Sequence, residues 1–157
     1  MPDKPSYLGL LNAIAVGEST AHRLVTEWAG VTKDPAVRDV LLKVAAREGE
    51  HAMTFARRIN ELGYEVRPRQ DDTAQQHLDA VRSDCSDLEK MKAIGVIDPD
   101  EPDGPDIFES YFDDHSIDSR TGELLGRFIA EERESEQMLR DCYRSLRDAA
   151  HSTSNGD

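Results

Sequence analysis

The sequence is poor in the residues that build disulfide scaffolds, metal knuckles and all-β cores. It has two cysteines in 157 residues, Cys85 and Cys142, and they do not form a Cys-x-x-Cys motif. This excludes a four-cysteine zinc or iron site and favours the reducing cytoplasm as the place where the protein works. Aromatic residues make up only 6% of the chain and charged residues 32%, a balance typical of helices with solvated outer faces.

Basic residues are also scarce relative to acidic ones. There are 19 Lys and Arg against 32 Asp and Glu, which gives a formal net charge of -13. Nucleic acids and anionic membranes bind basic surfaces, so we expect neither as a partner. No apolar run is long enough to cross a bilayer, and the first residues, MPDKPSYLGLL, lack the pattern of a signal peptide. The negative charge suits the protein to attract cations.

Apolar residues recur at helical spacing in four segments. These segments predict helices over about 6–29, 34–62, 73–95 and 117–150. Asp34 and Pro35 are a typical helix start, and Gly63 is a typical helix end. The stretch IDPDEPDGPD cannot continue a helix, because prolines and a glycine interrupt it, and it predicts a long acidic loop. The sequence thus predicts an all-α domain over residues 1–150, a four-helix bundle, followed by a flexible tail over residues 151–157.

Carboxylates and one histidine interrupt the apolar stripes near the middle of three of these helices. Glu18 lies on the first stripe, Glu48 and His51 on the second, and Glu132 with Ser135 on the fourth. A bundle brings them to one layer, where burying an ionised carboxylate is costly. No Lys or Arg lies at a mid-stripe position to neutralise them, but a divalent cation held by carboxylate oxygens and an imidazole nitrogen would. Glu48 and His51 are one helical turn apart and can hold the same ion.

Each of these residues has a simpler interpretation when it is taken alone. A histidine on an apolar stripe is more often a hydrogen-bonded core residue than a metal ligand. A glutamate assigned to the inward face is often a surface residue, because the apolar face of a helix is easily assigned one position away from its true place. The combination of carboxylates and a histidine at one level of neighbouring helices is what favours a metal site.

Three stretches carry these residues: VGES around Glu18, DPAVRDVLLKVAAREGEHAMTFARRINELG in the second helix, and FIAEERESEQML in the fourth. Together they resemble the ferritin-like superfamily, and its rubrerythrin branch most closely, over most of the chain. The resemblance implies a ferritin-like four-helix bundle with a di-iron site. That site takes Glu from the first helix, Glu-x-x-His from the second, Glu from the third, and Glu or Glu-x-x-His from the fourth. Glu18, Glu48, His51 and Glu132 match it.

Two positions depart from the rubrerythrin pattern. Ser135 stands where the second histidine is expected, and a serine hydroxyl is a poor ligand for iron. The third stripe carries Cys85 instead of a glutamate, and a small buried hydrophobe is the simpler interpretation of that cysteine. Asp84 beside it, or Glu89 about one turn further along, is then the candidate for the third-helix ligand. Iron is the metal that the resemblance implies, with manganese or zinc as alternatives.

The resemblance implies a rubrerythrin-like oxidoreductase that acts on peroxide or dioxygen and forms a homodimer. Many rubrerythrins carry a four-cysteine rubredoxin domain, which this chain lacks, so its electron donor would be a separate protein. The alternative is a ferritin-like bundle whose site is degenerate. Such a protein would hold one ion or none and act as a binding or structural module. Ser135 and Cys85 are the residues that favour this alternative.

Overall fold

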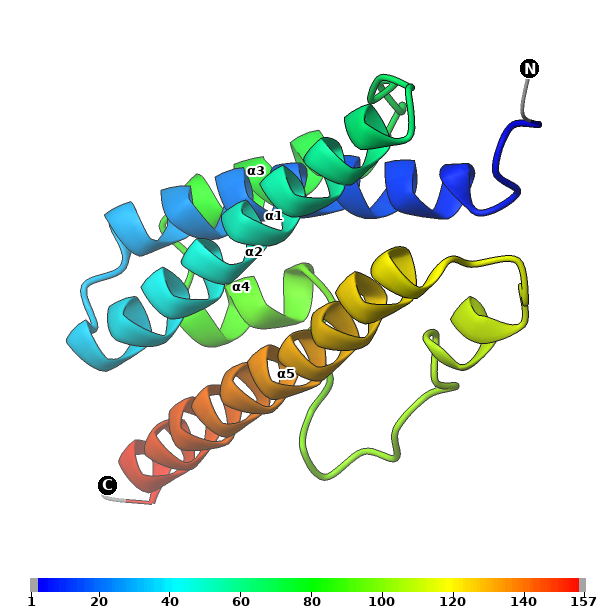
Figure 1. Ribbon diagram of the computed structural model, residues 1–157. Helices are drawn as coiled ribbons and strands as arrows, with labels where there is room; N and C mark the ends of the chain where they lie inside the picture. The colour runs from blue at the N-terminus through cyan, green and yellow to red at the C-terminus, as the bar shows by residue number, and fades with distance from the viewer. Residues whose placement is uncertain (1–2, 156–157) are drawn as a thin grey trace.

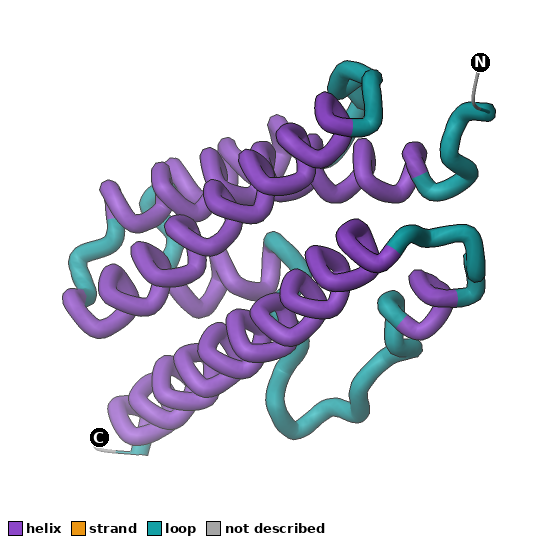
Figure 2. Tube along the Cα trace, in the orientation of Figure 1, coloured by secondary structure: helices purple, strands orange, loops and turns teal. Residues whose placement is uncertain are grey.

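Helices account for all the regular secondary structure in the computed structural model, which describes residues 3–155. In chain order they are α1 (Leu8–Val31), α2 (Pro35–Glu61), α3 (Ala74–Arg82), α4 (Asp87–Ala93), the 3-10 helix η1 (Glu109–Phe112) and α5 (Ser119–Ser154). No strand occurs in this part of the chain (Figure 2), so the predicted all-α class is confirmed. Among the same residues, no helix combines the length and the apolar character needed to span a membrane.

The antiparallel pair α1 and α2 is the most extensively packed part of the fold (Figure 1). The Asp34 carboxylate accepts a hydrogen bond from the backbone nitrogen of Ala36 at 2.9 Å, and Pro35 occupies the first turn of α2. Gly63 follows the helix with a φ of 91°, a left-handed conformation that favours glycine. The predicted start and end signals of this helix are therefore confirmed.

The apolar core is divided into two clusters along the helices. One cluster contains Trp28 and Leu41, near the α1–α2 connection, together with residues of α3, α4 and the later part of α5. The other contains Leu11 and Phe55, near the opposite ends of α1 and α2, together with the first turns of α5. Polar residues occupy the level between the clusters, so apolar packing is not continuous along the molecule.

The prediction of a third long helix is wrong, because the segment forms two short helices with a turn between them. The Ser83 hydroxyl donates a hydrogen bond to the Ala80 carbonyl at 2.7 Å, at the end of α3. Ser86 then begins α4 in a reciprocal capping box with Glu89. Short polar side chains that bond the local backbone compete with continuation of a helix. Within the described residues, three long helices rather than four run the length of the molecule (Figure 1).

The last helix, α5, is longer than predicted. The Asp118 carboxylate accepts a hydrogen bond from the backbone nitrogen of Thr121 at 2.8 Å and so caps its start. The helix continues to Ser154, through most of the segment 151–157 that was predicted to be a flexible tail. Residues 156 and 157 of that segment lie outside the described part of the chain.

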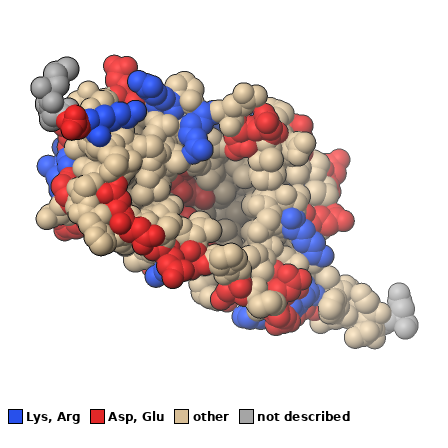
Figure 3. All heavy atoms as spheres, turned by 90° about the vertical axis from the view of Figure 1, so that its right-hand side faces the viewer, with Lys and Arg blue, Asp and Glu red and all other residues tan. Residues whose placement is uncertain are grey.

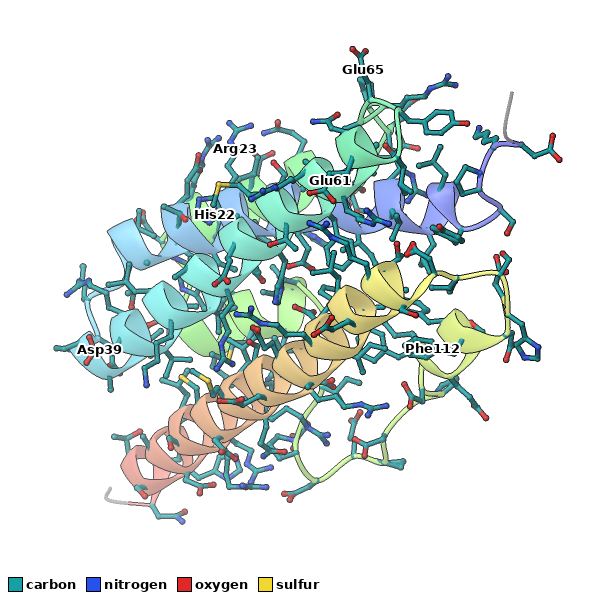
Figure 4. The ribbon with its side chains drawn as sticks, viewed as in Figure 1. His22, Arg23, Asp39, Glu61, Glu65 and Phe112 are labelled. Carbon is teal, nitrogen blue, oxygen red and sulfur yellow. The ribbon has the colours of Figure 1, made fainter. Side chains whose placement is uncertain are left out.

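A long acidic loop connects α4 to α5, as predicted. It swings outward from the helices and contains η1 (Figure 1). Phe112, labelled at the end of η1 in Figure 4, is 47% exposed. In the same view Asp39 is labelled in the first part of α2, and Glu65 on the loop that follows the end of this helix. The face of the molecule shown in Figure 3 is hollowed near its centre, and acidic side chains lie beside the hollow.

Asp87 fastens the short helix α4 to the end of α1. Its carboxylate accepts a hydrogen bond from the indole nitrogen of Trp28 at 2.8 Å and another from the Thr32 hydroxyl at 2.7 Å. Trp28 is fully buried and Thr32 is nearly so, which means that no water can replace Asp87 without rearrangement. This pair of bonds therefore positions the chain that follows α3.

We predict that Asp87→Ala lowers the free energy of unfolding by about 2–3 kcal/mol, because it leaves two buried donors without an acceptor. Urea denaturation followed by circular dichroism would measure the change. Asp84→Ala is a matched control in the exposed turn before α4, where the expected change is within about 0.5 kcal/mol. Equal effects of the two substitutions would contradict the assigned role of Asp87.

Candidate metal centre

A polar layer, which we define as Glu18, Glu48, His51, Glu132 and Ser135, lies between the two apolar clusters. Glu18 comes from α1, Glu48 and His51 from α2, and the other two from α5. Glu18, His51 and Ser135 are buried, and Glu48 and Glu132 are half-buried. The 3.6-residue period of each helix turns these positions toward the same interior level. The structure thus brings together the four residues that match the di-iron pattern.

The imidazole of His51 is the centre of this layer. Its Nδ1 lies 3.4 Å from Oε2 of Glu18 and 3.5 Å from Oε1 of Glu132. One ligand atom from each of these three residues lies within 4.8 Å of the other two. Carboxylate oxygens and an imidazole nitrogen at such separations can converge on one divalent cation.

Three buried polar atoms of the layer have no hydrogen-bond partner among the described residues. They are Oε2 of Glu18, Oε2 of Glu48 and Nδ1 of His51. Buried polar atoms are nearly always hydrogen-bonded, so three orphaned atoms at one level call for an explanation. All three are atoms that can bind a metal ion, and a cation among them would satisfy them together.

Two carboxylates of the layer, Glu48 and Glu18, resist ionisation. Burial raises the pKa of Glu48 from 4.5 to about 8, and the negative charges of Glu18 and Glu132 add to the shift. Burial likewise raises the pKa of Glu18. These are the shifts that follow when carboxylates share a site of low dielectric with no Lys or Arg among them. A bound cation would reverse them, because it favours the charged form of each ligand.

His51 is held in the opposite protonation state. Burial alone would lower its pKa, but the neighbouring carboxylates of Glu132, Glu18 and Glu131 raise it to about 10. In the absence of a cation, the imidazolium is therefore the positive charge that partly balances the layer. A metal ion at Nδ1 would displace this proton and take over the same electrostatic role.

Glu131 contacts the central imidazole of the layer, although the sequence pattern did not single it out. Its Oε2 lies 3.3 Å from Nε2 of His51, in a hydrogen bond, while its Oε1 accepts a hydrogen bond from Nε of Arg127 at 2.7 Å. The i, i+4 spacing of Arg127 and Glu131 is visible in the sequence. The sequence does not show that Glu131 contacts the His51 ring on α2. Glu131 directly precedes the expected ligand Glu132, and adjacent positions on a helix point in different directions.

Ser135 faces the same side of α5 as Glu132, as its spacing predicted. It is 5% exposed, and its hydroxyl accepts a hydrogen bond from Nη1 of Arg47 at 3.3 Å. Arg47 also donates to Glu134 at 2.9 Å. Ser135 therefore occupies the position of the expected second histidine but is engaged by a guanidinium instead.

The structure does not bring the third-helix candidates to the layer. Asp84 is exposed in the turn between α3 and α4. Glu89 is exposed and its carboxylate accepts a hydrogen bond from the backbone nitrogen of Ser86 at 3.0 Å, as part of the α4 cap. Cys85 lies in the same turn, 3.0 Å from the Ser83 hydroxyl. The break in the predicted helix explains these positions, because Asp84 and Cys85 now lie in the turn and Glu89 caps the short helix that follows it.

Gly49, which follows Glu48 in α2, allows the ring of His22 (labelled in Figure 4) to pack closely on that helix. Nδ1 of His22 lies 2.7 Å from the Ala45 carbonyl oxygen, and a Cβ at position 49 would lie 3.0 Å from the same nitrogen. His22 thus ties α1 to the backbone of α2. It supports the geometry of the layer by fixing the two helices that carry Glu18 and His51.

No protein-family model, curated protein or solved structure matches this chain.

We predict that the metal-free protein becomes less stable as the pH rises from about 5 to about 9. The pKa of Glu48 is raised from 4.5 to about 8 on folding, so between these values the folded state keeps a proton that the unfolded state releases. The raised pKa of His51, about 10 against 6.5, acts with the same sign above neutral pH. Melting temperatures of chelator-treated protein across this range would measure the effect.

Glu48→Gln removes one source of this pH dependence and is expected to flatten the curve. Glu123→Gln is the matched control, because Glu123 is exposed on α5 and does not belong to the polar layer. Parallel curves for wild type and Glu48→Gln would contradict the assigned protonation of Glu48.

Proposed function

We propose that this chain is a carboxylate–histidine metalloprotein in which Glu18, His51 and Glu132 hold a divalent cation. The observation that carries the proposal is the set of three orphaned buried atoms, on Glu18, Glu48 and His51. Each of them is a metal-binding atom, and they lie at one level between two apolar clusters. In a purely structural role, the His51 imidazolium alone would have to balance the carboxylates of Glu18, Glu48 and Glu132 in a site of low dielectric.

Glu131 supports this assignment by orienting the imidazole. A carboxylate that accepts a hydrogen bond from Nε2 favours the tautomer with its proton on Nε2. The lone pair then lies on Nδ1, the atom that faces Glu18 and Glu132. Metal-binding histidines generally have such a hydrogen-bonded partner on the other ring nitrogen.

Charge also fits a bound cation. Glu18, Glu48 and Glu132 together bring three negative charges when ionised, and a neutral His51 brings none. One divalent cation leaves this set at about −1, and two leave it at about +1, which one further anion would neutralise. Glu48, whose Oε2 is buried and has no partner, is the additional ligand that either arrangement requires.

We further propose that the protein is a divergent ferritin-like bundle of the rubrerythrin type and a non-haem iron oxidoreductase. Bound iron would supply one-electron redox chemistry toward peroxide or dioxygen. The chain's own residues bind the ion, orient the imidazole through Glu131 and bury the site between apolar clusters. In this proposal α3 and α4 together correspond to the third long helix of a ferritin-like bundle. A separate protein donates electrons, and the chain acts as a homodimer in the cytoplasm.

A second candidate function is a binding or structural module that holds a single ion. The observation that favours it is the position of Asp84 and Glu89, neither of which reaches the polar layer to complete a second metal position. Metal analysis of the purified protein separates the two functions. Two irons per chain, with an oxo-bridge absorption band after oxidation, favour the oxidoreductase, and one zinc per chain favours the module.

We predict that Glu48→Ala combined with His51→Ala abolishes high-affinity metal binding, because it removes the ligands of α2. In wild type, saturating divalent metal should raise the melting temperature, since an ion that binds only the folded state stabilises it by about 2.7 kcal/mol at a hundred times Kd. Isothermal titration and thermal melts would measure both effects. Glu123→Gln serves as the control that keeps wild-type binding. Unchanged metal content in the double variant would disprove the site.

We also predict that Ser135→His strengthens binding of a second ion by about 10- to 100-fold, because it adds an imidazole on the α5 side of the layer. Ser135 lines the same groove as Glu48 and Glu132. It is buried and its hydroxyl contacts Arg47, so the larger imidazole ring must displace that contact. Overpacking is expected to cost about 1–3 kcal/mol of stability. Metal titrations of both proteins would test this, with Ser135→Asn as a control for bulk. Equal stoichiometry and affinity in all three would refute the prediction.

A further inference from the structure

A groove leads from the surface to the polar layer, between α2 and α5. Its volume is about 910 Å³, and it is bordered by α2, by the chain that follows α4, by the acidic loop and by α5. Glu48, Glu132 and Ser135 of the polar layer all contribute to its lining. Grooves of this size are typical of sites for small organic molecules, and peroxide or dioxygen would fill only a small part of it.

The groove has apolar walls. Its aliphatic and aromatic lining residues include Val44, Ile94, Val96, Ile97, Phe108 and Leu139. Phe108 is held in place by edge-on contacts with Tyr111 and Phe128, at ring-centroid distances of 5.4 and 6.0 Å. An organic molecule that enters the groove would therefore bury an apolar body against a wall that is already formed.

The two arginines that line the groove are engaged by the acidic loop. Nη2 of Arg133 lies 2.7 Å from Oδ2 of Asp106, and Arg140 forms an ion pair with Asp103. These ion pairs fasten the loop to α5, and the two aspartates neutralise the positive charge of the two arginines. A carboxylate or phosphate ligand would have to compete with these aspartates for either arginine.

After this pairing, the remaining ionisable side chains of the groove lining are Glu48, Glu132 and Glu136. The first two lie at the inner end, in the polar layer. One divalent ion among Glu18, Glu48 and Glu132 leaves their summed charge at about −1 when all are ionised, and Glu136 adds another negative charge outside the layer. The groove is thus apolar along its walls and anionic in net charge, with or without one bound cation.

We propose that the groove binds an organic cation, an amine with an apolar body, with its ammonium group directed to Glu136 and the polar layer. The apolar body of such an amine would pack on the apolar walls through the hydrophobic effect. Its ammonium group would donate charge-assisted hydrogen bonds to the carboxylates. The further step, that this amine is a substrate at the neighbouring metal centre, rests on the proposed function. The binding of the amine follows from the groove itself.

The test uses three probes of nearly equal size: 4-phenylbutylamine, 4-phenylbutan-1-ol and 4-phenylbutyrate. Each is titrated calorimetrically into the full chain at moderate ionic strength, both metal-free and loaded with zinc, which has no redox chemistry of its own. We expect the amine to bind about tenfold more tightly than the alcohol, because one charge-assisted hydrogen bond is gained, and the carboxylate to bind most weakly. Equal affinity for the three probes, or a preference for the carboxylate, would overturn the proposal.

Variants locate the site. Glu136 is exposed, so Glu136→Gln is expected to fold normally and to weaken amine binding about threefold or more while leaving alcohol binding unchanged. Glu123→Gln, on the same helix but outside the groove lining, should bind the amine like wild type. Loss of amine affinity in both variants or in neither would show that the ammonium group is not directed to Glu136 and would overturn the proposal.

Metal titrations of the same samples keep this inference separate from the proposed function. Metal binding without selective amine binding overturns the inference and leaves the metal site standing. Selective amine binding without metal binding overturns the proposed function and leaves the groove as an amine site.

Discussion

The structure depends on how the charges of three carboxylates and one imidazole are balanced at a largely buried level of the helices. Glu18, Glu48 and Glu132 surround His51 between two apolar clusters. Without a cation, the layer is stabilised by keeping protons on Glu48 and on His51, whose pKa values are raised to about 8 and about 10. In the proposed metal centre, a cation would make the same atoms its ligands. The layer would then have two ways to reach near-neutral charge, and the choice between them would couple metal binding to proton release.

This balance explains why the core is built as two clusters instead of one. A continuous apolar core would be more stable, because buried ionisable groups seldom repay the cost of their desolvation. The chain places Trp28 and Leu41 on one side of the layer and Leu11 and Phe55 on the other, all essentially free of solvent. These clusters hold the helices together while the layer remains polar. Residues selected for function commonly reduce stability in this way, and the surrounding packing compensates.

The turn between α3 and α4 has consequences far from its own position. Ser83 and Ser86 bond the local backbone and so prevent one long third helix. The chain after α4 continues into the acidic loop, which is fastened to α5 through ion pairs of Arg133 and Arg140. A groove then remains between the loop and the layer. The break in the predicted helix thus removes a candidate ligand position, and the groove leads to Glu48 and Glu132 of the layer.

The sequence by itself determined the all-α class, both ends of α2 and the acidic loop, because helical periodicity, Asp34, Pro35 and Gly63 act through local backbone geometry. It also placed Glu18, Glu48, His51 and Glu132 on inward faces, since the period of a helix fixes which residues share a side. Only the tertiary structure decided that Glu131 holds the second nitrogen of His51 and that Arg47 engages Ser135. Those contacts join residues about eighty positions apart, and their existence depends on how α5 is set against α2, which no local pattern specifies.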